Sequence, residues 1–337
     1  MIYRFVDILN ASGIDSTVVH KSGHFRCTWF ANQTAIVGAQ DVRFQKGDLL
    51  VLPEWYRQLI PWLAPGVPNV IINQNAYEMF SDVPFERGTP ATLMSADTIG
   101  IVGISEDNLQ YFELCFPDVR VDAIRLSLDT ELFHPSPDGK TTTIAYMPRK
   151  KLKELNQILH ILDRRGTLDG WELQPIIGVS ESEVARLLGS AAIFLALNDR
   201  EGIALPSLEA MASGCVVVGF HGGSGQEYMK PDLSVPIPDG EVTTVVRSLE
   251  AEMSRWVEGD GEQRRMTRAA VEFVKSTYTK ERERDDVVRV FSDALSRVSG
   301  TTPSSERLNL KLLASNSDEL NKVVRKLSRN REAPART

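Results

Sequence analysis

The stretch that decides the fold is Asp199-Arg200-Glu201-Gly202-Ile203-Ala204-Leu205-Pro206-Ser207-Leu208-Glu209-Ala210-Met211-Ala212-Ser213-Gly214. Proline suits the first turn of a helix, because its fixed φ fits there and its missing N–H would have no partner anyway. Glycine suits the position just past a helix end, where the left-handed conformation is common. The stretch therefore predicts a helix that begins near Pro206 and ends before Gly214, with Glu201 in the preceding loop and Glu209 in the first turns.

The loop before this helix has the chemistry of a site for an anion that also carries hydroxyl groups. The backbone N–H groups of residues 202–205 approach a helix N-terminus, where unpaired N–H groups and the helix dipole favour anions. The carboxylates of Glu201 and Glu209 accept hydrogen bonds from hydroxyl groups. A ligand that is both phosphorylated and polyhydroxylated fits this combination.

A second cluster is basic and follows the strand predicted at residues 143–147. It reads Pro148-Arg149-Lys150-Lys151-Leu152-Lys153. Open α/β sheets bind ligands outside the carboxyl ends of their strands. Positive side chains in the first turn of a helix oppose its dipole, so several together favour a bound anion. A solvated charge run at a helix start is the alternative interpretation.

Short apolar runs alternate with helical patterns along the chain, which is typical of βαβ units with parallel sheets. Runs that are apolar through their length suit strands covered on both faces. The predicted strands are residues 16–20, 48–53, 69–73, 98–104, 121–126, 143–147, 171–177, 193–197 and 215–220. The predicted helices include residues 2–9, 152–165, 181–188 and 281–298.

Residues 199–214 resemble the signature of the retaining glycosyltransferases of family 4, which have the GT-B fold. That signature reads Glu-Gly-Phe-Gly-Leu-Pro-x-x-Glu-Ala-Met-Ala-x-Gly before an apolar strand, and here Ile203 replaces Phe and Ala204 replaces Gly. Residues 123–135 resemble the family's interdomain pattern, Val-Ile-x-Asn-Gly-Val-Asp-x-x-x-Phe-x-Pro. The resemblance implies an α/β protein with two Rossmann-like domains that face a central cleft.

The resemblance also implies the domain limits. The acceptor-side N-terminal domain is expected at residues 1–134 and the nucleotide-sugar domain at 140–280. A helix at 281–299 is expected to cross back to the first domain. A basic, partly disordered tail is expected at 300–337.

The implied reaction moves a sugar from a nucleotide-sugar donor to a glycan or lipid-linked acceptor, with retention of the anomeric configuration. Arg149 matches the arginine that the family places on the donor diphosphate, and the accompanying lysine is Lys153 or, in reserve, Lys150. Glu201 would orient the donor sugar and Glu209 would hold the nucleotide ribose. Neither a metal nor another cofactor is expected, because positive side chains neutralise the diphosphate.

Two further loops of the second half resemble family elements. Gly178-Val179-Ser180 resembles a Gly-x-Val loop whose backbone near Val179 meets the nucleobase, although capping of a helix by Ser180 explains it equally well. The segment His221-Gly222-Gly223-Ser224-Gly225-Gln226-Glu227 resembles a Gly-Gly-x-x-Glu loop with one extra residue. A simple turn is the alternative there.

The acceptor-side candidates of the first half are Asn73, Asn75 and Glu54. Both asparagines lie just after a predicted strand, and their amides suit sugar hydroxyls. Glu54 ends another strand and is followed by Trp55 and Tyr56. For Trp55, a turn with packed aromatic side chains is the favoured interpretation.

Bulk properties exclude several classes of protein. The net charge of −7 argues against a general nucleic-acid binder. The cysteines at positions 27, 115 and 215 have no zinc-site spacing, which favours reduced thiols in the cytoplasm. The absence of an apolar run of about 18 residues predicts no transmembrane helix. The basic tail is expected either to be solvated or to touch anionic lipid, which would place the protein at the inner face of the membrane.

The start of the chain departs from the family pattern. In the family, a first strand and a Gly-Gly loop precede the helix that corresponds to residues 2–9, and the natural protein is therefore expected to begin upstream of Met1. Two other functions stay open on the residues alone. One is a glycosidase that uses Glu201 and Glu209 as an acid/base pair. The other is a non-catalytic GT-B module that binds a nucleotide sugar or a partner.

Overall fold

The chain forms two compact α/β units. The computed structural model describes residues 1–28, 30, 32–56, 59–81, 85, 87, 95–298, 300, 302–303, 306–310 and 312. The first unit comprises Met1–Ile104, Leu109–Ile124 and the chain from Arg284 onward, and the second comprises Ser105–Asn108 and Arg125–Glu283. The division at Ile124 precedes the expected limit at residue 134, because Leu128 and Phe133 are buried in the core of the second unit.

The second unit is built on a five-stranded parallel sheet with the order β11-β10-β9-β7-β8. All residues of β9 and β10 are buried. They read Ala-Ala-Ile-Phe-Leu-Ala-Leu and Val-Val-Val-Gly-Phe, as expected for strands covered on both faces. The strands are β7 (Thr141–Tyr146), β8 (Glu172–Pro175), β9 (Ala191–Leu197), β10 (Val216–Phe220) and β11 (Val235–Ile237).

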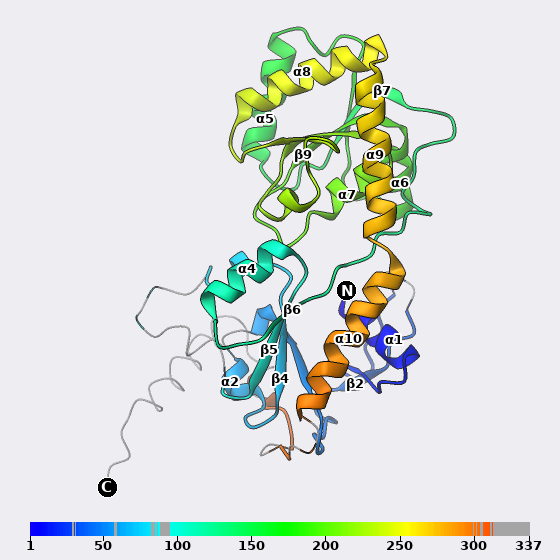
Figure 1. Cartoon of the computed structure of the whole chain (residues 1–337). Helices are drawn as coiled ribbons and strands as arrows, with labels where there is room; N and C mark the ends of the chain where they lie inside the picture. Colours follow the sequence, from blue (N-terminus) through cyan, green and yellow to red (C-terminus); the bar gives the residue numbers. More distant parts are fainter. Residues whose placement is uncertain are drawn as a thin grey trace. The chain divides into compact units, whose positions relative to one another are not determined.

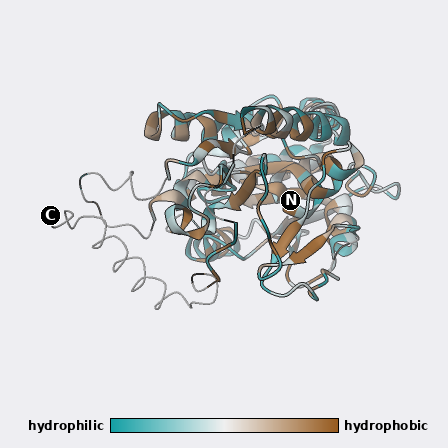
Figure 2. Ribbon diagram, turned by 90° about the horizontal axis from the view of Figure 1, so that it is seen from below, coloured by the Kyte–Doolittle hydropathy of each residue, from teal (hydrophilic) through white to brown (hydrophobic). Residues whose placement is uncertain are grey.

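Helices cover both faces of this sheet (Figure 1). On one face lie α5 (Leu152–Arg164) and α8 (Val242–Glu258), whose apolar residues join one core cluster with the strands. On the other lie α6 (Glu181–Ser190), α7 (Leu205–Ala212) and α9 (Gly261–Thr277). Figure 2 shows hydrophobic residues on the strands and hydrophilic stretches on the helices.

The helix expected in the opening stretch is confirmed as α7. Pro206 is its second residue, and the helix ends at Ala212 with Ser213 as the C-cap. Gly214 follows with a φ of +73°, the left-handed conformation that favours glycine at this position. The loop–helix boundary that holds Glu201 and Glu209 therefore follows from local backbone preferences.

The first unit contains a four-stranded parallel sheet with the order β3-β4-β5-β6. Its strands are β3 (Leu50–Pro53), β4 (Asn69–Ile72), β5 (Thr98–Gly103) and β6 (Val121–Ala123). A separate parallel pair is formed by β1 (Val18–His20) and β2 (Ile36–Gly38). The helices of this part are α1 (Ile2–Ala11), α2 (Ile60–Leu63), α4 (Glu106–Cys115, which begins in the second unit) and α10 (Lys280–Val298, whose first turn belongs to the second unit).

Every strand predicted from the sequence is present in the structure, but β2 and β11 were not predicted. Both are only three residues long, and β11 contains Pro236. Proline cannot donate a backbone hydrogen bond and is confined to positions such as edge strands. β11 is an edge strand of its sheet, which explains why proline is tolerated there.

The first described residues of the expected basic, partly disordered tail pack against other parts of the first unit. The backbone N–H of Phe44 donates to the carbonyl of Glu306 at 2.9 Å, and that of Asn309 donates to Leu63 at 2.8 Å. Leu308 and Leu312 are buried. Lys311 and the basic residues from 313 onward lie outside the described residues. In the described part of the chain, no helix is long and apolar enough to cross a membrane.

Candidate functional site

The carboxyl ends of β7 and β9 bring the basic loop and the first glutamate together. Nζ of Lys150 lies 2.9 Å from Oε2 of Glu201, and the side chains are 37% and 18% exposed, respectively. The backbone N–H of Asp199 also donates to Oε1 of Glu201 at 3.4 Å. Lys150 was the reserve choice for the phosphate-binding lysine, and the structure places it directly beside the carboxylate expected to bind the sugar.

Lys151 holds the same edge together in a different way. Its Nζ lies 3.2 Å from Oδ1 of Asp199 and 3.1 Å from Oδ2 of Asp239, which follow β9 and β11. Partial burial alone lowers the pKa of Lys151, but hydrogen bonds to the two aspartates outweigh it and raise the pKa. Lys151 thus bridges two loops, and its ammonium group is committed to protein carboxylates.

The backbone of Lys151 is strained. Its φ of +51° makes it the one non-glycine residue with a positive φ in the described part of the chain. This conformation costs roughly 1–2 kcal/mol for a residue with a Cβ. The two ion pairs of the side chain hold it in place, so the strain is a cost of shaping the loop between β7 and α5.

Arg149 and Lys153 are the exposed members of the basic cluster. Arg149 lies in the turn after β7, and Lys153 is the second residue of α5. Within the described residues, neither side chain has an ion pair or a hydrogen bond. Their charges are therefore available to an anion from solution, in contrast to that of Lys151.

The N-terminus of α7 has donors without acceptors, but fewer than the sequence predicts. The N–H of Ala204 donates to the hydroxyl oxygen of Tyr228 at 3.1 Å, so it is not available to a ligand in this structure. Tyr228 is buried, and the sequence carried no signal for this contact. Ala204 provides no side-chain cap for α7, and the N–H groups of Ile203 and Leu205 have no acceptor among the described residues.

The glycine loop after β10 fits closely against the loop that carries Glu201. Gly223 forms a parallel bridge with Glu201. A Cβ on Gly222 would overlap the carbonyl oxygen of Asp199 and would lie 2.7 Å from Cβ of Asn198, so no larger residue fits without rearrangement. The glycines are therefore required for close packing of two loops at one edge of the sheet.

Glu209 lies on α7 with its carboxyl group mostly buried. Burial, reinforced by the negative charge of Glu181, raises the pKa of Glu209 to about 7. An ionised carboxylate in this position lacks a compensating cation, and hydroxyl groups of a ligand would supply the hydrogen bonds it needs. Active sites are where such shifts are concentrated.

We expect nucleotide binding to depend on the ionisation of Glu209. If only the carboxylate binds ribose hydroxyls, a pKa of about 7 makes the affinity for a nucleoside diphosphate roughly tenfold weaker at pH 6 than at pH 8. Calorimetric titration at both pH values measures this ratio. Glu209→Gln should abolish the part of the pH dependence that is not due to the phosphate of the nucleotide itself, and an unchanged ratio in the variant would contradict the assignment.

The same carboxyl group affects stability. Because its folded pKa is raised, it favours the folded state below its ordinary pKa of 4.5, and this contribution is lost as the pH rises through about 7. Glu209→Gln is therefore expected to raise the melting temperature at pH 8 and not at pH 4.5. Such a gain would be the usual consequence of removing a functional but unfavourable charge.

The loop between β8 and α6 presents the expected base-side residue to solvent. Val179 is 43% exposed and follows Gly178, whose φ is +63°. Ser180 caps α6 by accepting a hydrogen bond from the N–H of Glu183 at 3.3 Å. Helix capping therefore explains Ser180, whereas the exposure of Val179 is unexplained by packing and suits contact with a ligand.

Glu227 ends the glycine loop and has a structural partner. Its carboxylate accepts a hydrogen bond from the N–H of Asp107 at 3.2 Å, at the first turn of α4. Burial raises the pKa of Glu227, and the hydrogen bonds from the first turn of α4 act in the opposite direction. Ser105 caps the same helix by accepting from the N–H of Asn108 at 3.2 Å.

The acceptor-side candidates of the first unit lie just after neighbouring strands, and their side chains are buried or form hydrogen bonds within the protein. Glu54 is only 1% exposed, and its Oε1 accepts a hydrogen bond from the N–H of Gln74 at 2.9 Å. Asn73 is fully buried, and Oδ1 of Asn75 accepts from the N–H of Tyr77 at 3.2 Å. These three side chains shape the strand ends and present little surface to a ligand.

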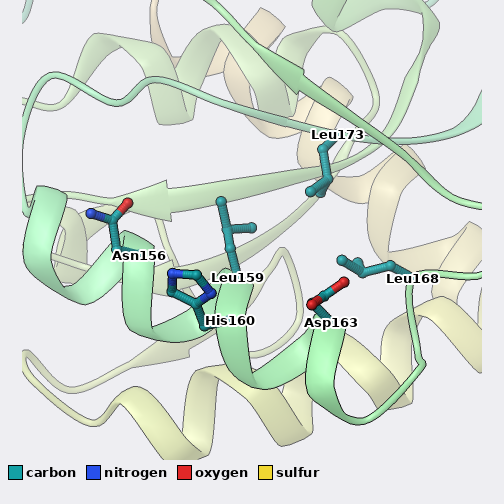
Figure 3. Close-up of a pocket in the computed structure, with 6 residues that line it drawn as sticks. All are labelled: Asn156, Leu159, His160, Asp163, Leu168 and Leu173. Atoms are coloured by element: carbon teal, nitrogen blue, oxygen red, sulfur yellow. The ribbon is translucent and has the colours of Figure 1, made fainter.

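A separate depression lies on α5, away from the loops described above (Figure 3). Its volume is about 390 Å³, and its lining residues are Asn156, Leu159, His160, Asp163, Leu168 and Leu173. The polar members lie on the exposed side of α5, so none is desolvated. This depression has no convergent polar groups of the kind that define a catalytic pocket.

In the described residues, no group of three histidine, cysteine, aspartate or glutamate side chains could hold a metal ion.

Comparison with known proteins identifies the fold. No protein-family model matches the chain. Over 252 residues the chain is 25% identical to an alpha-1,6-glucosyltransferase from Actinobacillus pleuropneumoniae, and the match covers 68% of this chain and 71% of that protein. Sucrose-phosphate synthase from Thermosynechococcus elongatus has a similar structure, with a TM-score of 0.55, 13% identity and coverage of 74% of both chains. The chain has the GT-B fold.

A second solved structure agrees. HepE from Anabaena in complex with UDP gives a TM-score of 0.53 at 12% identity, and the match covers 67% of this chain and 72% of HepE. The GT-B fold predicted from residues 199–214 and 123–135 is therefore confirmed. The curated relatives that the chain matches are named as a glucosyltransferase and a mannosyltransferase.

Proposed function

We propose that this GT-B protein transfers a sugar from a nucleotide-sugar donor to a glycan or glycolipid acceptor, with retention of the anomeric configuration. The contact between Lys150 and Glu201 is the observation that carries the proposal. It places a cation suited to a diphosphate beside a carboxylate suited to sugar hydroxyls, at the ligand-binding edge of a parallel sheet. The glucosyltransferase relative and the UDP complex of HepE support the same chemistry.

In this proposal, the positive groups stabilise the leaving nucleoside diphosphate. Cleavage of the bond between the sugar and the phosphate leaves negative charge on the phosphate oxygen. Arg149, Lys150 and Lys153, together with the free N–H groups of Ile203 and Leu205, provide fixed positive charge and donors for it. Cationic side chains thereby take the place of a metal ion.

The retaining step proposed here is an attack by the acceptor on the face that the diphosphate leaves. The acceptor hydroxyl oxygen forms a bond to the anomeric carbon, the bond to the phosphate oxygen breaks, and the hydroxyl proton passes to that oxygen. Glu201 orients the donor sugar during the step, and the ribose rests on Glu209. The alpha linkage in the name of the glucosyltransferase relative supports retention.

Turnover with a panel of nucleotide sugars tests the proposal. We expect release of the nucleoside diphosphate with at least one donor, faster in the presence of glycan acceptors. Proton NMR of the product then reads the anomeric configuration, and an inverted product would exclude the retaining step. Binding of UDP without turnover of any donor would contradict the proposed activity.

We expect Arg149→Ala to weaken both UDP binding and turnover by at least about tenfold, because it removes a charged donor from the diphosphate. Arg164→Ala is the matched control, since Arg164 is an exposed arginine at the other end of α5. Calorimetry gives the affinity and steady-state kinetics give the rate. Equal effects of the two substitutions would show that Arg149 does not face the diphosphate.

A further inference from the structure

Just after β3, a charged residue is buried and the aromatic residue next to it is exposed, which is the reverse of what their chemistry predicts. Glu54 is 1% exposed, whereas Trp55 is 64% exposed. The favoured interpretation of Trp55 as a packed turn residue is therefore wrong. Among the described residues, its indole ring has no aromatic or cationic partner.

The segment that carries Trp55 is held firmly. Residues Glu54–Tyr56 form a short 3-10 helix directly after β3. The buried carboxylate of Glu54 ties this helix to the turn after β4 through the N–H of Gln74. The short helix that carries the indole is therefore linked to the neighbouring strand end by this hydrogen bond.

The pairing of β3 and β4 places Trp55 and Gln74 on neighbouring strand ends. Pro53 and Ile72 are the last registered pair of the two strands, and Trp55 and Gln74 each follow two residues later. Both lie at the carboxyl edge of the four-stranded parallel sheet, which is the edge where open α/β sheets bind ligands. The ends of β3 and β4 that carry these two residues both belong to the first unit.

The amide of Gln74 is a polar group available to a ligand at this edge. Asn73 is fully buried, and the side chain of Asn75 accepts a hydrogen bond from its own turn. The side chain of Gln74 is half-buried and has no hydrogen bond among the described residues. A primary amide both donates and accepts, which matches a sugar hydroxyl.

We propose that Trp55 is a stacking platform for a pyranose ring of the acceptor glycan, with the amide of Gln74 binding a hydroxyl at its rim. A pyranose has an apolar C–H face and a polar edge, and an exposed rigid indole offers a large apolar surface at a low entropic cost. Single exposed apolar residues are common on protein surfaces. Here the indole is 64% exposed at a ligand-binding edge, and the unpaired amide of Gln74 follows the end of the neighbouring strand.

The choice of a glycan as the ligand rests on the proposed transferase function. The platform concerns the acceptor, and its test is therefore independent of donor binding. The protein contains five tryptophans, which can all be labelled with 5-fluorotryptophan. The resonance of Trp55 is assigned by its disappearance in Trp55→Phe.

The labelled full chain is titrated with the methyl α-glycosides of glucose, galactose, mannose and N-acetylglucosamine at millimolar concentrations. We expect at least one glycoside to shift the Trp55 fluorine resonance with saturation while the resonance of Trp62, a half-buried tryptophan on α2, stays in place. Gln74→Ala should weaken this shift about fivefold or more in apparent affinity. No shift with any of the four glycosides would overturn the proposal.

Titration with UDP separates the two proposals. If UDP binds but no glycoside shifts Trp55, the platform is wrong and the transferase function stands. If a glycoside shifts Trp55 but UDP does not bind and no donor turns over, the protein binds glycans and the transferase function is wrong.

With a glycoside that serves as the acceptor, Trp55→Ala should raise the acceptor KM about five- to tenfold. Trp55→Phe should return KM most of the way to the wild-type value. Leu114→Ala, at an 85% exposed position on α4, should leave KM unchanged.

Discussion

Glu201→Gln is expected to lower kcat by about 10²–10³-fold while leaving the fold and the affinity for UDP intact. The substitution removes a negative charge from the position where the donor sugar would lie, next to Lys150. Fixed charges at a reacting centre act on the transition state, so kcat should respond more strongly than the binding of a product nucleotide.

The affinity for UDP provides a second readout of the same variant. Without a ligand, Glu201 pairs with Lys150, so the loss of its charge frees Lys150 for the diphosphate. UDP binding to Glu201→Gln should therefore be unchanged or tighter, whereas a merely damaged site would bind UDP more weakly. Calorimetry distinguishes these results.

Glu183→Gln is the matched control, because Glu183 is also paired with a cation. Its Oε1 lies 2.6 Å from Nη2 of Arg186 on the exposed side of α6. Surface pairs of this kind contribute little, so we expect wild-type activity. If Glu201→Gln kept kcat within twofold of the wild type, Glu201 would have no role in the chemical step.

Lys140→Met is expected to destabilise the second unit by about 3 kcal/mol. The ammonium group of Lys140 is mostly desolvated and donates to the carbonyl oxygens of Leu188, Gly189 and Ala191 at 3.1, 3.1 and 2.7 Å. These carbonyls lie at the C-terminus of α6, where the helix dipole favours a positive charge. Burial lowers the pKa of Lys140.

Methionine keeps the length of the side chain but leaves these acceptors without their charged donor. Cys215 contacts two of the same carbonyls through Sγ, at 3.2 Å to Leu188 and 3.4 Å to Ala191, and a thiol is a weak donor. It therefore replaces only a small part of the lost interaction. Scanning calorimetry should show the transition of the second unit lowered by about 6–12 °C.

Lys275→Met serves as the control for this stability measurement. Lys275 is an exposed lysine in the last turn of α9, and its substitution should change the unfolding free energy by no more than about 0.5 kcal/mol. Equal melting temperatures for the two variants would show that Lys140 does not act as the donor for α6.

Lys140 shows what a sequence pattern does not reveal. In the sequence it closes a turn-rich linker, Ser136-Pro137-Asp138-Gly139-Lys140, and nothing in that context distinguishes it from a solvated lysine. Its acceptors lie about 50 positions further along the chain. They reach it only because α6 packs against the sheet of the second unit.

The residues that follow the carboxyl ends of β3 and β7 also show what a sequence pattern does not reveal. Lys150 and Lys151 are neighbours with the same chemistry, yet one pairs with Glu201 and the other with Asp199 and Asp239. Glu54 and Trp55 are likewise adjacent, and the carboxylate is the buried member of the pair. The left-handed conformation of Lys151 and the Glu54–Gln74 contact decide these orientations, and both depend on distant strands.

The sequence by itself determined the parallel α/β class, the strands of the three sheets apart from β2 and β11, and the position of Glu201 and Glu209 across the start of α7. These features follow from the apolar runs and from Pro206 and Gly214, whose backbone preferences act within a few residues. Only the tertiary structure decided which cations and amides are free, which carboxylates are buried and which aromatic ring faces solvent. Those properties depend on residues that the strand order brings together from far apart in the chain, so no local pattern contains them.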